Sequence, residues 1–458
     1  MFYNFNYFHI VVLFFIYNFR PNLCNKISIQ NINEYEKEIS MYNEFVKQRF
    51  EPNFLKDKPS SSSLYNPKNS MIRSSRSVFH VKQNPLEKYI VEGKEKPAVN
   101  KTKLSPRPSF NLSKNIPLTM DPKVYRCNIP ESIECKNRTN LYRNRIYTEL
   151  KKSMQFYLNE SNYYNVDTKA KSLFFDLRYF PSTCLAKRAN VRILKRKDHP
   201  FNKVYLGKLF PKKKLFKHIK NIQNCAIISS AGSMAGSKLG KFIDHHDIVM
   251  RFNNAPVEGY EVDVGSKTTI RVVNSQVVTK PQFNFTESPI FHNTIIAAWD
   301  PGKYNSTLKD WLNNAADFDL FSNYEKYRKK YPKYDAYLID PRSIWHLWQM
   351  LHIFSGEPIR KNPPSSGFIG LSLLLPHCPY IDFIEYIPST RLNGRCHYYS
   401  KELNAACTFG AWHPLAAEKL MTLDMNIADD FTVFQEGIIR IRRPDHLLCD
   451  SISNLLRF

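Results

Sequence analysis

Residues 225–240, CAIISSAGSMAGSKLG, are the stretch that decides the fold: an apolar run, a turn of small residues and the start of a helix. The run CAII is short and apolar, as buried strands are. Ser230 and Gly232 in the turn let the backbone approach a ligand closely, and the helix N-terminus that follows suits an anion. The segment matches neither the pattern GxxxxGK[ST] nor GxGxxG. Taken alone, it is also compatible with an ordinary strand–helix connection.

The same alternation continues along the chain. Apolar runs typical of buried strands alternate with longer segments that have the spacing of helices. This alternation predicts a largely parallel α/β sandwich. The strand-like runs are DIVMRFN (247–253), KTTIRVVNSQ (267–276), NTIIAAWD (293–300) and YIDFIEYIP (380–388), and the helix-like segments are SKLGKFIDHHD (237–247), PRSIWHLWQMLHIF (341–354) and PLAAEKLMTLDM (414–425).

Composition changes sharply before this region. Residues 21–165 are rich in Pro, Ser, Lys and Asn, so they bury little apolar surface and are predicted to form a polar, partly disordered stem. Residues 166–458 are predicted to be the folded domain. Residues 1–20 are apolar and aromatic up to Arg20, which indicates either an uncleaved membrane anchor or a cleaved signal peptide. In both cases the rest of the chain enters the secretory route.

The glycosylation sequons and the spacing of the cysteines are both consistent with the secretory route. The cysteines are dispersed without a CxxC pair, which argues against a zinc ribbon and favours disulfides in an oxidising compartment. Eight of the nine can pair, which leaves Cys24 beside the apolar segment as the odd one. The N-x-S/T sequons are at Asn100, Asn111, Asn137, Asn159, Asn284 and Asn305.

The chain of 458 residues is strongly basic, with 66 Lys+Arg against 41 Asp+Glu and a net charge of +25. Such a charge fits a nucleic acid, a membrane surface or an anionic substrate. The N-terminal segment, the sequons and the dispersed cysteines argue against nucleic acid as a partner. The Lys-rich segment 211–220 lacks interleaved aromatic residues and is interpreted as a solvated basic surface.

Four segments resemble the conserved motifs of the eukaryotic sialyltransferase family, in the family's order. Residues 225–276, with SSAG, RFN, DVGSKTT and NSQ, resemble the large sialylmotif, and PPSSGFIGLSLLLPHCPYIDFIEY (363–386) resembles the small one. CHYYS (396–400) resembles motif III, and HPLAAEK (413–419) resembles the very small motif. The strings NPPSSG, WDP and ACTFGAWHP are most similar to the beta-galactoside alpha-2,6 branch.

This resemblance implies an α/β fold, a three-layer α/β/α sandwich that is a GT-A-like variant with a mostly parallel sheet. It implies an inverting enzyme that moves sialic acid from CMP-sialic acid to the 6-hydroxyl of terminal galactose (Gal-beta-1,4-GlcNAc) on glycoprotein N-glycans. No cofactor and no metal are expected, because CMP carries a single phosphate that imidazole, hydroxyl and amide groups can neutralise. The expected location is the Golgi membrane, as a single-pass type II protein with a lumenal catalytic domain or a cleaved secreted form.

Two histidines are the predicted catalytic residues. His413 is the candidate general base, since an imidazole with an ordinary pKa of ~6.5 accepts a hydroxyl proton near neutral pH. His397, in motif III, would stabilise or protonate the leaving phosphate. The alpha-2,6 branch commonly has Tyr at His397 and Trp412 and Gln at Ser400, so this chain departs from the branch there.

The resemblance also assigns binding residues and disulfides. The predicted donor-binding residues are Ser230, Gly232, Asn253, Asn274, Ser365, Ser366, Gly367, Trp412 and Lys419, and the predicted acceptor-binding residues are Asp317, Gln276 and Thr408. The family pairs Cys184 with Cys449, Cys225 with Cys378 and Cys396 with Cys407, which leaves Cys127 and Cys135 for a local bridge.

Four alternatives remain open at this stage. Lys419 also fits a solvated helix position, and Asp317-Phe318-Asp319 matches a metal-binding DxD pattern, although a loop pair of carboxylates is preferred. Other linkages or acceptors (alpha-2,3 or N-acetylgalactosamine) would use the same chemistry. A catalytically silent glycan-binding relative is the rival from another class; retention of both His397 and His413 argues against it.

Overall fold

The computed structural model describes residues 121–156, 162–168, 181–404, 406–410, 412–444 and 449. Within them, seven strands form one sheet in the order β5-β4-β3-β2-β1-β6-β7. The strand pairs are parallel except β6–β7, which is antiparallel. The strands are β1 (Asn224–Ile228), β2 (Ile248–Phe252), β3 (Ile270–Asn274), β4 (Ile295–Trp299), β5 (Ala336–Leu338), β6 (Tyr380–Ile384) and β7 (Ile438–Arg442).

Helices connect the strands, and local sequence sets their ends. Helix α11 shows this: the Asp340 carboxylate accepts a hydrogen bond from the backbone of Arg342, Pro341 occupies the first turn, and Gly356 ends the helix in a left-handed conformation. The helices are α3 (Ile133–Phe156), α4 (Ser182–Arg188), α5 (Tyr205–Lys208), α6 (Gly240–Asp244), α7 (Glu261–Val264), α8 (Ser275–Thr279), α9 (Leu308–Asp310), α10 (Leu320–Lys330), α11 (Pro341–Ser355), α12 (Ser366–Leu374), α13 (Ala406–Phe409), α14 (Leu415–Asp424) and α15 (Asp430–Phe434).

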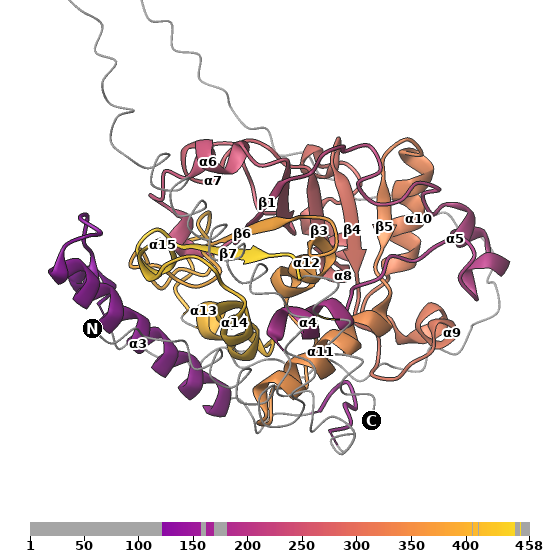
Figure 1. Ribbon diagram of the computed structural model, residues 1–458. Helices are drawn as coiled ribbons and strands as arrows, with labels where there is room; N and C mark the ends of the chain where they lie inside the picture. Colours follow the sequence, from indigo (N-terminus) through magenta and orange to yellow (C-terminus); the bar gives the residue numbers. More distant parts are fainter. Residues whose placement is uncertain are drawn as a thin grey trace, which may run out of the picture. The chain divides into compact units, whose positions relative to one another are not determined.

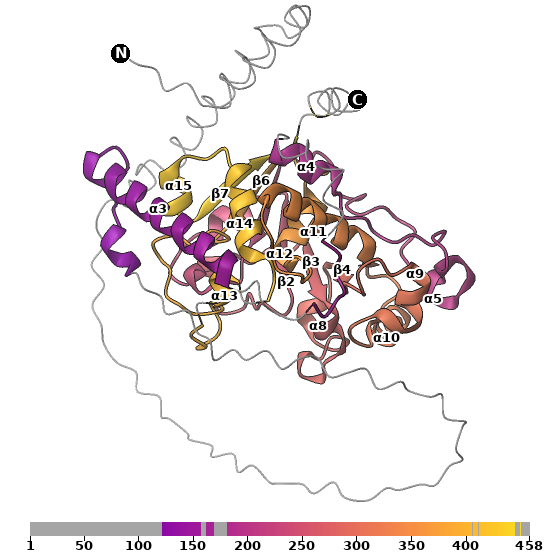
Figure 2. The same ribbon diagram turned by 90° about the horizontal axis from the view of Figure 1, so that it is seen from below.

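The helices cover both faces of the sheet, so the expected three-layer α/β/α sandwich is confirmed (Figure 1). Alternate strand residues such as Ile227 and Met250 pack with α4, α11, α12 and α14 on one face. The residues between them, such as Ala226 and Val249, pack with α6 and α7 on the other, while Val273 packs there with α8 and α10. Figure 2 shows α3, α14, α12 and α11 together in front of the strands.

Helix α3 lies within the range 21–165 that the sequence analysis assigned to the stem. It is part of the folded unit: Tyr142, Ile146 and Leu150 are fully buried in the main core, where α3 contacts α14 and α15. The folded part therefore extends N-terminal to residue 166. The residues of α3 that face the core are few, and its charged and amide residues resemble those of the polar segment before it.

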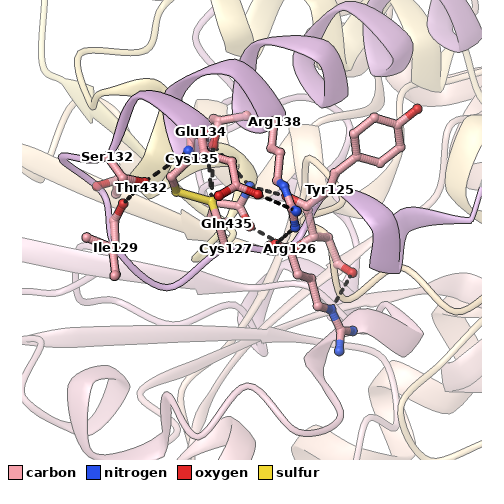
Figure 3. The surroundings of a disulfide bond; sticks show 12 residues. Tyr125, Arg126, Cys127, Ile129, Ser132, Glu134, Cys135, Arg138, Thr432 and Gln435 are labelled. Carbon is pink, nitrogen blue, oxygen red and sulfur yellow. Dashed lines mark hydrogen bonds and ion pairs between the residues drawn. A yellow bond between two sulfur atoms is a disulfide. The ribbon is translucent and has the colours of Figure 1, made fainter.

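A disulfide between Cys127 and Cys135 closes the loop before α3, as predicted. Figure 3 shows Gln435, at the end of α15, next to this bridge. The Gln435 amide donates to the Tyr125 carbonyl and to the Thr139 hydroxyl, both at 3.0 Å. The bridge and α15 together fix the beginning of α3 against the domain.

The other three disulfides also form as predicted. Their pairs are Cys184–Cys449, Cys225–Cys378 and Cys396–Cys407. The second joins the start of β1 to the loop before β6, and thus ties the two halves of the sheet at its centre. By the loop-entropy model, a closed loop of 153 residues stabilises the fold by about 5 kcal/mol.

Several predictions concern residues outside the described part. These are the segment 1–20, the stem up to residue 120, Cys24, and the sequons at Asn100, Asn111 and Asn159. In the part of the chain that the structure describes, no helix has the length and hydropathy needed to cross a bilayer. Asn137, Asn284 and Asn305 are exposed, and the lysines of segment 211–220 are exposed as well.

Candidate active site

Polar residues follow the carboxyl ends of four neighbouring strands. Ser230 comes after β1, Asn253 after β2 and Asp300 after β4, while Asn274 ends β3. Because these strands are parallel, their carboxyl ends meet at one edge of the sheet. The strand order reverses between β1 and β6, and open α/β sheets bind ligands in the crevice at such a switch point. The candidate site therefore lies at this edge.

The turn after β1 is held against motif III. The backbone N–H of Tyr398 donates to the Ser230 carbonyl at 3.1 Å, and the Asn393 amide donates to the Gly232 carbonyl at 3.0 Å. A Cβ at Gly232 would lie 2.5 Å from Cβ of Arg395 and 2.6 Å from its carbonyl oxygen. Only glycine permits this approach, so the large motif and motif III meet here.

The next two strand ends are joined by a hydrogen bond. Asn253 has a left-handed backbone (φ 48°), and its side-chain oxygen accepts from the backbone N–H of Asn274 at 3.2 Å. Asn274 in turn caps α8, because its side-chain oxygen accepts from the N–H of Val277 at 3.0 Å. The two predicted donor-binding amides are thus brought together.

Ser365 begins α12 and is bound by a buried carboxylate. Glu418 on α14 accepts the Ser365 N–H at 2.8 Å, the Ser365 hydroxyl at 2.5 Å and the Tyr386 hydroxyl at 2.6 Å. Glu418 is fully buried, and burial raises its pKa although these hydrogen bonds oppose the shift. The Ser365 hydroxyl also caps α12 by accepting from Phe368. Glu418 therefore fixes the small motif to the very small motif.

The next two residues of the small motif are packed closely. The Ser366 hydroxyl accepts a hydrogen bond from the Trp299 indole at 3.0 Å. A Cβ at Gly367 would come within 3.2 Å of the Tyr386 ring and 3.3 Å of the Phe383 ring. The start of α12 is consequently locked between β4 and the end of β6.

The loop before α14 presents His413. Its Nδ1 lies 2.7 Å from the Pro363 carbonyl oxygen, and the Asn362 amide donates to the Trp412 carbonyl at 2.6 Å. A carbonyl only accepts, so Nδ1 carries the proton and Nε2 is the basic nitrogen of the neutral ring. A half-buried imidazole with a fixed tautomer is suited to proton transfer.

His397 lies in motif III, one residue before the Tyr398–Ser230 contact. Its ring stacks on Tyr399 with centroids 5.0 Å apart and planes at 14°. Burial lowers the pKa of His397 below its ordinary value, and the Glu402 carboxylate only partly opposes this. Without a ligand, burial thus favours the neutral form of the His397 ring.

Lys419 is buried, with 4% of its surface exposed, which rules out the solvated alternative. Its Nζ lies 5.5 Å from the centroid of the Tyr386 ring. Burial lowers the pKa of Lys419 to about 7, although the carboxylates of Glu418 and Glu385 favour the charged form. An anion placed near this ammonium group would raise that pKa again.

Asp317 lies on the loop before α10. Its carboxylate accepts a hydrogen bond from the Tyr164 hydroxyl at 2.7 Å, and its backbone N–H donates to Asp300 at 3.0 Å. Asp319, the second member of the DxD pattern, instead caps α10 by accepting from Ser322 at 3.3 Å. The two carboxylates have different partners, which fits the loop interpretation.

The remaining predicted residues lie around these. Gln276 accepts a hydrogen bond from Lys280 at 3.2 Å, and the Lys280 ammonium lies 5.6 Å from the Phe318 ring centroid, so Gln276 is near the Asp317 loop. Thr408 is buried on α13, which precedes the His413 loop.

Two buried acids that hold segments of the candidate site together were not singled out in the sequence analysis. Glu418 and Lys419 are adjacent charged residues in the run LAAEKLM, whose other residues are apolar, and that contrast could have indicated a buried role for Glu418. Asp300 ends the strand-like run NTIIAAWD, where an acid at a strand end is a weaker signal. The partners of both residues come from distant segments, which the sequence alone does not bring together.

Comparison with known proteins identifies the family. The profile of glycosyltransferase family 29 (sialyltransferase) matches residues 185–429, and the chain belongs to this family. All four motif segments begin within that range.

The chain is similar to curated members of the family. It is 39% identical over 305 residues to beta-galactoside alpha-2,6-sialyltransferase 2 of Danio rerio, covering 66% of this chain and 58% of that protein. It is 39% identical over 253 residues to beta-galactoside alpha-2,6-sialyltransferase 1 of Homo sapiens, covering 55% of this chain and 62% of that protein. The chain thus matches somewhat more than half the length of these relatives. A crystal structure of a mammalian sialyltransferase in complex with Gal-beta-1-3GalNAc-ortho-nitrophenol matches with a TM-score of 0.33 and 18% identity, covering 53% of this chain and 80% of that chain.

Proposed function

We propose that this protein is an inverting sialyltransferase that moves sialic acid from CMP-sialic acid to the 6-hydroxyl of a terminal galactose on glycoprotein glycans. Family membership and the alpha-2,6 names of the relatives support the reaction class and the linkage. The observation that carries the catalytic assignment is the His413–Pro363 hydrogen bond, because it makes Nε2 the basic nitrogen at the junction of two motifs.

The chemistry requires a base on the acceptor side. Nε2 of His413 takes the proton of the acceptor hydroxyl, and the oxygen attacks the anomeric carbon of sialic acid. The bond from that carbon to the phosphate oxygen breaks, and CMP leaves with the electron pair. Attack from the face opposite the leaving group inverts the configuration. A positioned general base of this kind contributes about 10²–10⁴-fold to the rate.

The leaving group would be bound on the other side, around motif III and the β1 turn. The phosphate charge favours protonation of His397, whose pKa burial has lowered in the free protein. Lys419, whose pKa is about 7, would respond in the same way to an anion nearby. The turn at Ser230–Gly232 and the amides of Asn253 and Asn274 would add hydrogen bonds to the donor. Such groups neutralise a single phosphate, so the proposed reaction needs no metal.

The proposal includes a place in the cell. The apolar segment 1–20 would anchor the protein in the Golgi membrane with the catalytic domain in the lumen, or would be cleaved to release a secreted form. Four disulfides support an oxidising compartment.

The test is a transfer assay on residues 121–458 with CMP-sialic acid and N-acetyllactosamine, in the presence of a chelator. We expect a product that resists an alpha-2,3-specific sialidase. His413→Gln should lower kcat by at least about 100-fold while CMP still binds. His377→Gln is the matched control, because His377 is a half-buried imidazole that packs on Phe216 outside the site. That variant should keep its activity.

The outcomes separate the alternatives. An alpha-2,3 product would contradict the linkage but keep the reaction. Transfer to N-acetylgalactosamine alone would contradict the acceptor. CMP binding without transfer to any acceptor would favour a silent glycan-binding relative, and retained activity in His413→Gln would refute the assigned base.

A further inference from the structure

Asp300 is a fully buried carboxylate that the proposed chemistry does not use. It accepts hydrogen bonds from four residues at the carboxyl edge of the sheet. Its Oδ1 accepts from the N–H of Gly302 and from the indole of Trp311, both at 3.0 Å. Its Oδ2 accepts from the Ser275 hydroxyl at 2.5 Å, and both oxygens accept from the N–H of Asp317, at 3.0 and 3.1 Å. An acid so fully coordinated holds the segments around it at fixed distances.

Two of the residues that donate hydrogen bonds to Asp300 come from opposite sides of the proposed site, the CMP-sialic acid side and the acceptor side. Ser275 directly follows Asn274, the donor-side amide that is hydrogen-bonded to Asn253. Asp317 is the residue proposed to bind the acceptor. Asp300 therefore links the end of β3 to the acceptor loop. Hydrogen bonds connect Asn253 with Asn274, and the adjacent Ser275 with Asp300 and Asp317.

The Asp317 carboxylate is oriented from a second direction. The Tyr164 hydroxyl donates to its Oδ2 at 2.7 Å, and Tyr164 is buried against Trp345, with ring centroids 5.3 Å apart. The Tyr164 carbonyl accepts from the N–H of Tyr304 at 3.2 Å. Asp300 thus fixes the backbone of Asp317, while Tyr164 fixes its side chain.

We infer that Asp300 is a positioning residue for the acceptor: it holds Asp317 where galactose hydroxyls bind and, through Ser275, ties that loop to the donor-binding end of β3. This inference rests on the proposed function. Asp300 is fully buried, so its loss should affect acceptor use through Asp317. An acceptor misplaced by about 1 Å reacts roughly 100-fold more slowly.

The test compares variants of residues 121–458 by steady-state kinetics and by calorimetric titration with CMP. Asp300→Asn should lower kcat/KM for N-acetyllactosamine by about 10–100-fold, while the dissociation constant for CMP changes by less than about twofold. Asp317→Asn should have a similar effect. Both substitutions act on one interaction. The kcat/KM of the double variant should therefore lie within about threefold of the kcat/KM of the less active single variant.

Two further variants keep the inference falsifiable. Ser275→Ala removes one hydrogen bond and should lower kcat/KM for the acceptor by about 3–10-fold, even if Asp300→Asn does not fold. Asp340→Asn is the matched control: Asp340 is a buried acid after the neighbouring strand β5, paired with Arg192 and Arg342. It should lower the melting temperature but leave the acceptor KM unchanged.

Different results refute different statements. If the unsubstituted protein transfers no sialic acid, the proposed function fails and the inference with it. If that protein is active but Asp300→Asn weakens CMP and acceptor binding equally, only the inference fails. Independent, multiplying losses in the Asp300→Asn/Asp317→Asn double variant would also overturn it, as would full acceptor use by Ser275→Ala.

Discussion

Asp382 is buried and Glu436 is half-buried, and the surroundings of these two carboxyl groups shift their pKa values in opposite directions. Burial alone would raise the pKa of Asp382, but the Arg440 guanidinium and a hydrogen bond from His246 outweigh it and leave the pKa below its ordinary value. Burial raises the pKa of Glu436 to about 7, with the Asp429 carboxylate adding to the shift and Arg391 opposing it. The charge of Asp382 is favoured by the guanidinium beside it, whereas the charge of Glu436 is disfavoured by desolvation and a neighbouring carboxylate, which the Thr432 hydrogen bond and Arg391 offset only in part.

Glu436 therefore predicts a pH dependence of stability. Between the ordinary pKa of 4.5 and the folded value of about 7, the folded state binds more protons than the unfolded state. The stabilisation is complete below about pH 4.5 and is lost as the pH rises through about 7. We expect Glu436→Gln to become more stable than the unsubstituted protein above pH 7, by about 2 kcal/mol.

Chemical denaturation at a series of pH values measures this difference. Taking the difference between the two proteins cancels the contributions of all other groups, including Asp300, whose raised pKa of about 6 acts in the same direction. A difference that does not change between pH 5 and pH 8 would contradict the assignment to Glu436.

At the scale of elements, α3 carries a contact that reaches the catalytic loop. The buried Ser153 hydroxyl donates to the Phe409 carbonyl at 2.6 Å, four residues before His413. Ser153, Phe409 and His413 also line one small pocket between α3, α13 and α14. The helix is thus positioned to support the loop that carries the proposed base.

Ser153→Ala should leave the Phe409 carbonyl buried without this partner, which costs about 1–3 kcal/mol. We expect lower stability and a lower kcat, with little change in CMP binding. Thr148→Ala is the matched control, since the Thr148 hydroxyl also donates to a backbone carbonyl of α3 but on its exposed side. Equal melting temperatures for both variants would show that the buried contact is unimportant.

Some helices and strands could be predicted from the sequence, and others could not. Five strands and the helices α11 and α14 were predicted because each is a strongly apolar run bounded by clear end signals, and the shorter helix α6 lies within the predicted segment 237–247. β5 has only three residues, and β7 pairs antiparallel with β6, so neither follows the alternating pattern. The α3 stripe of Tyr142, Ile146 and Leu150 has a spacing of four, yet it is hidden among Lys, Arg and Asn residues.

For the whole molecule, strand order determines which residues meet. The motifs predicted that Ser230, Asn253, Asn274 and His413 belong to one site, but not which atoms they contact. The links Glu418–Ser365 and Asp300–Asp317 join segments 53 and 17 residues apart, and they exist because the carboxyl ends of the strands share one edge. Such contacts depend on topology, which local patterns do not contain.

The last prediction concerns where the independent folding unit begins. Residues 121–156 contribute the α3 stripe, the Tyr142 hydroxyl bond to the Ser389 carbonyl at 2.7 Å and the Arg143–Asp430 ion pair. Removing them exposes the apolar surface of α14 and α15 that the stripe covers. Because each large buried side chain stabilises the fold by about 1.5–3 kcal/mol, residues 157–458 should melt at least about 10 °C below residues 121–458.

Thermal unfolding and transfer activity of the two fragments check this directly. Ile146→Asp in residues 121–458 serves as a point variant, since it disrupts the same interface and leaves the disulfide between Cys127 and Cys135 in place. It should reproduce most of the loss, because a charge in that core has no partner. If residues 157–458 were as stable and active as the longer fragment, α3 would be an appendage and the folding unit would begin after it.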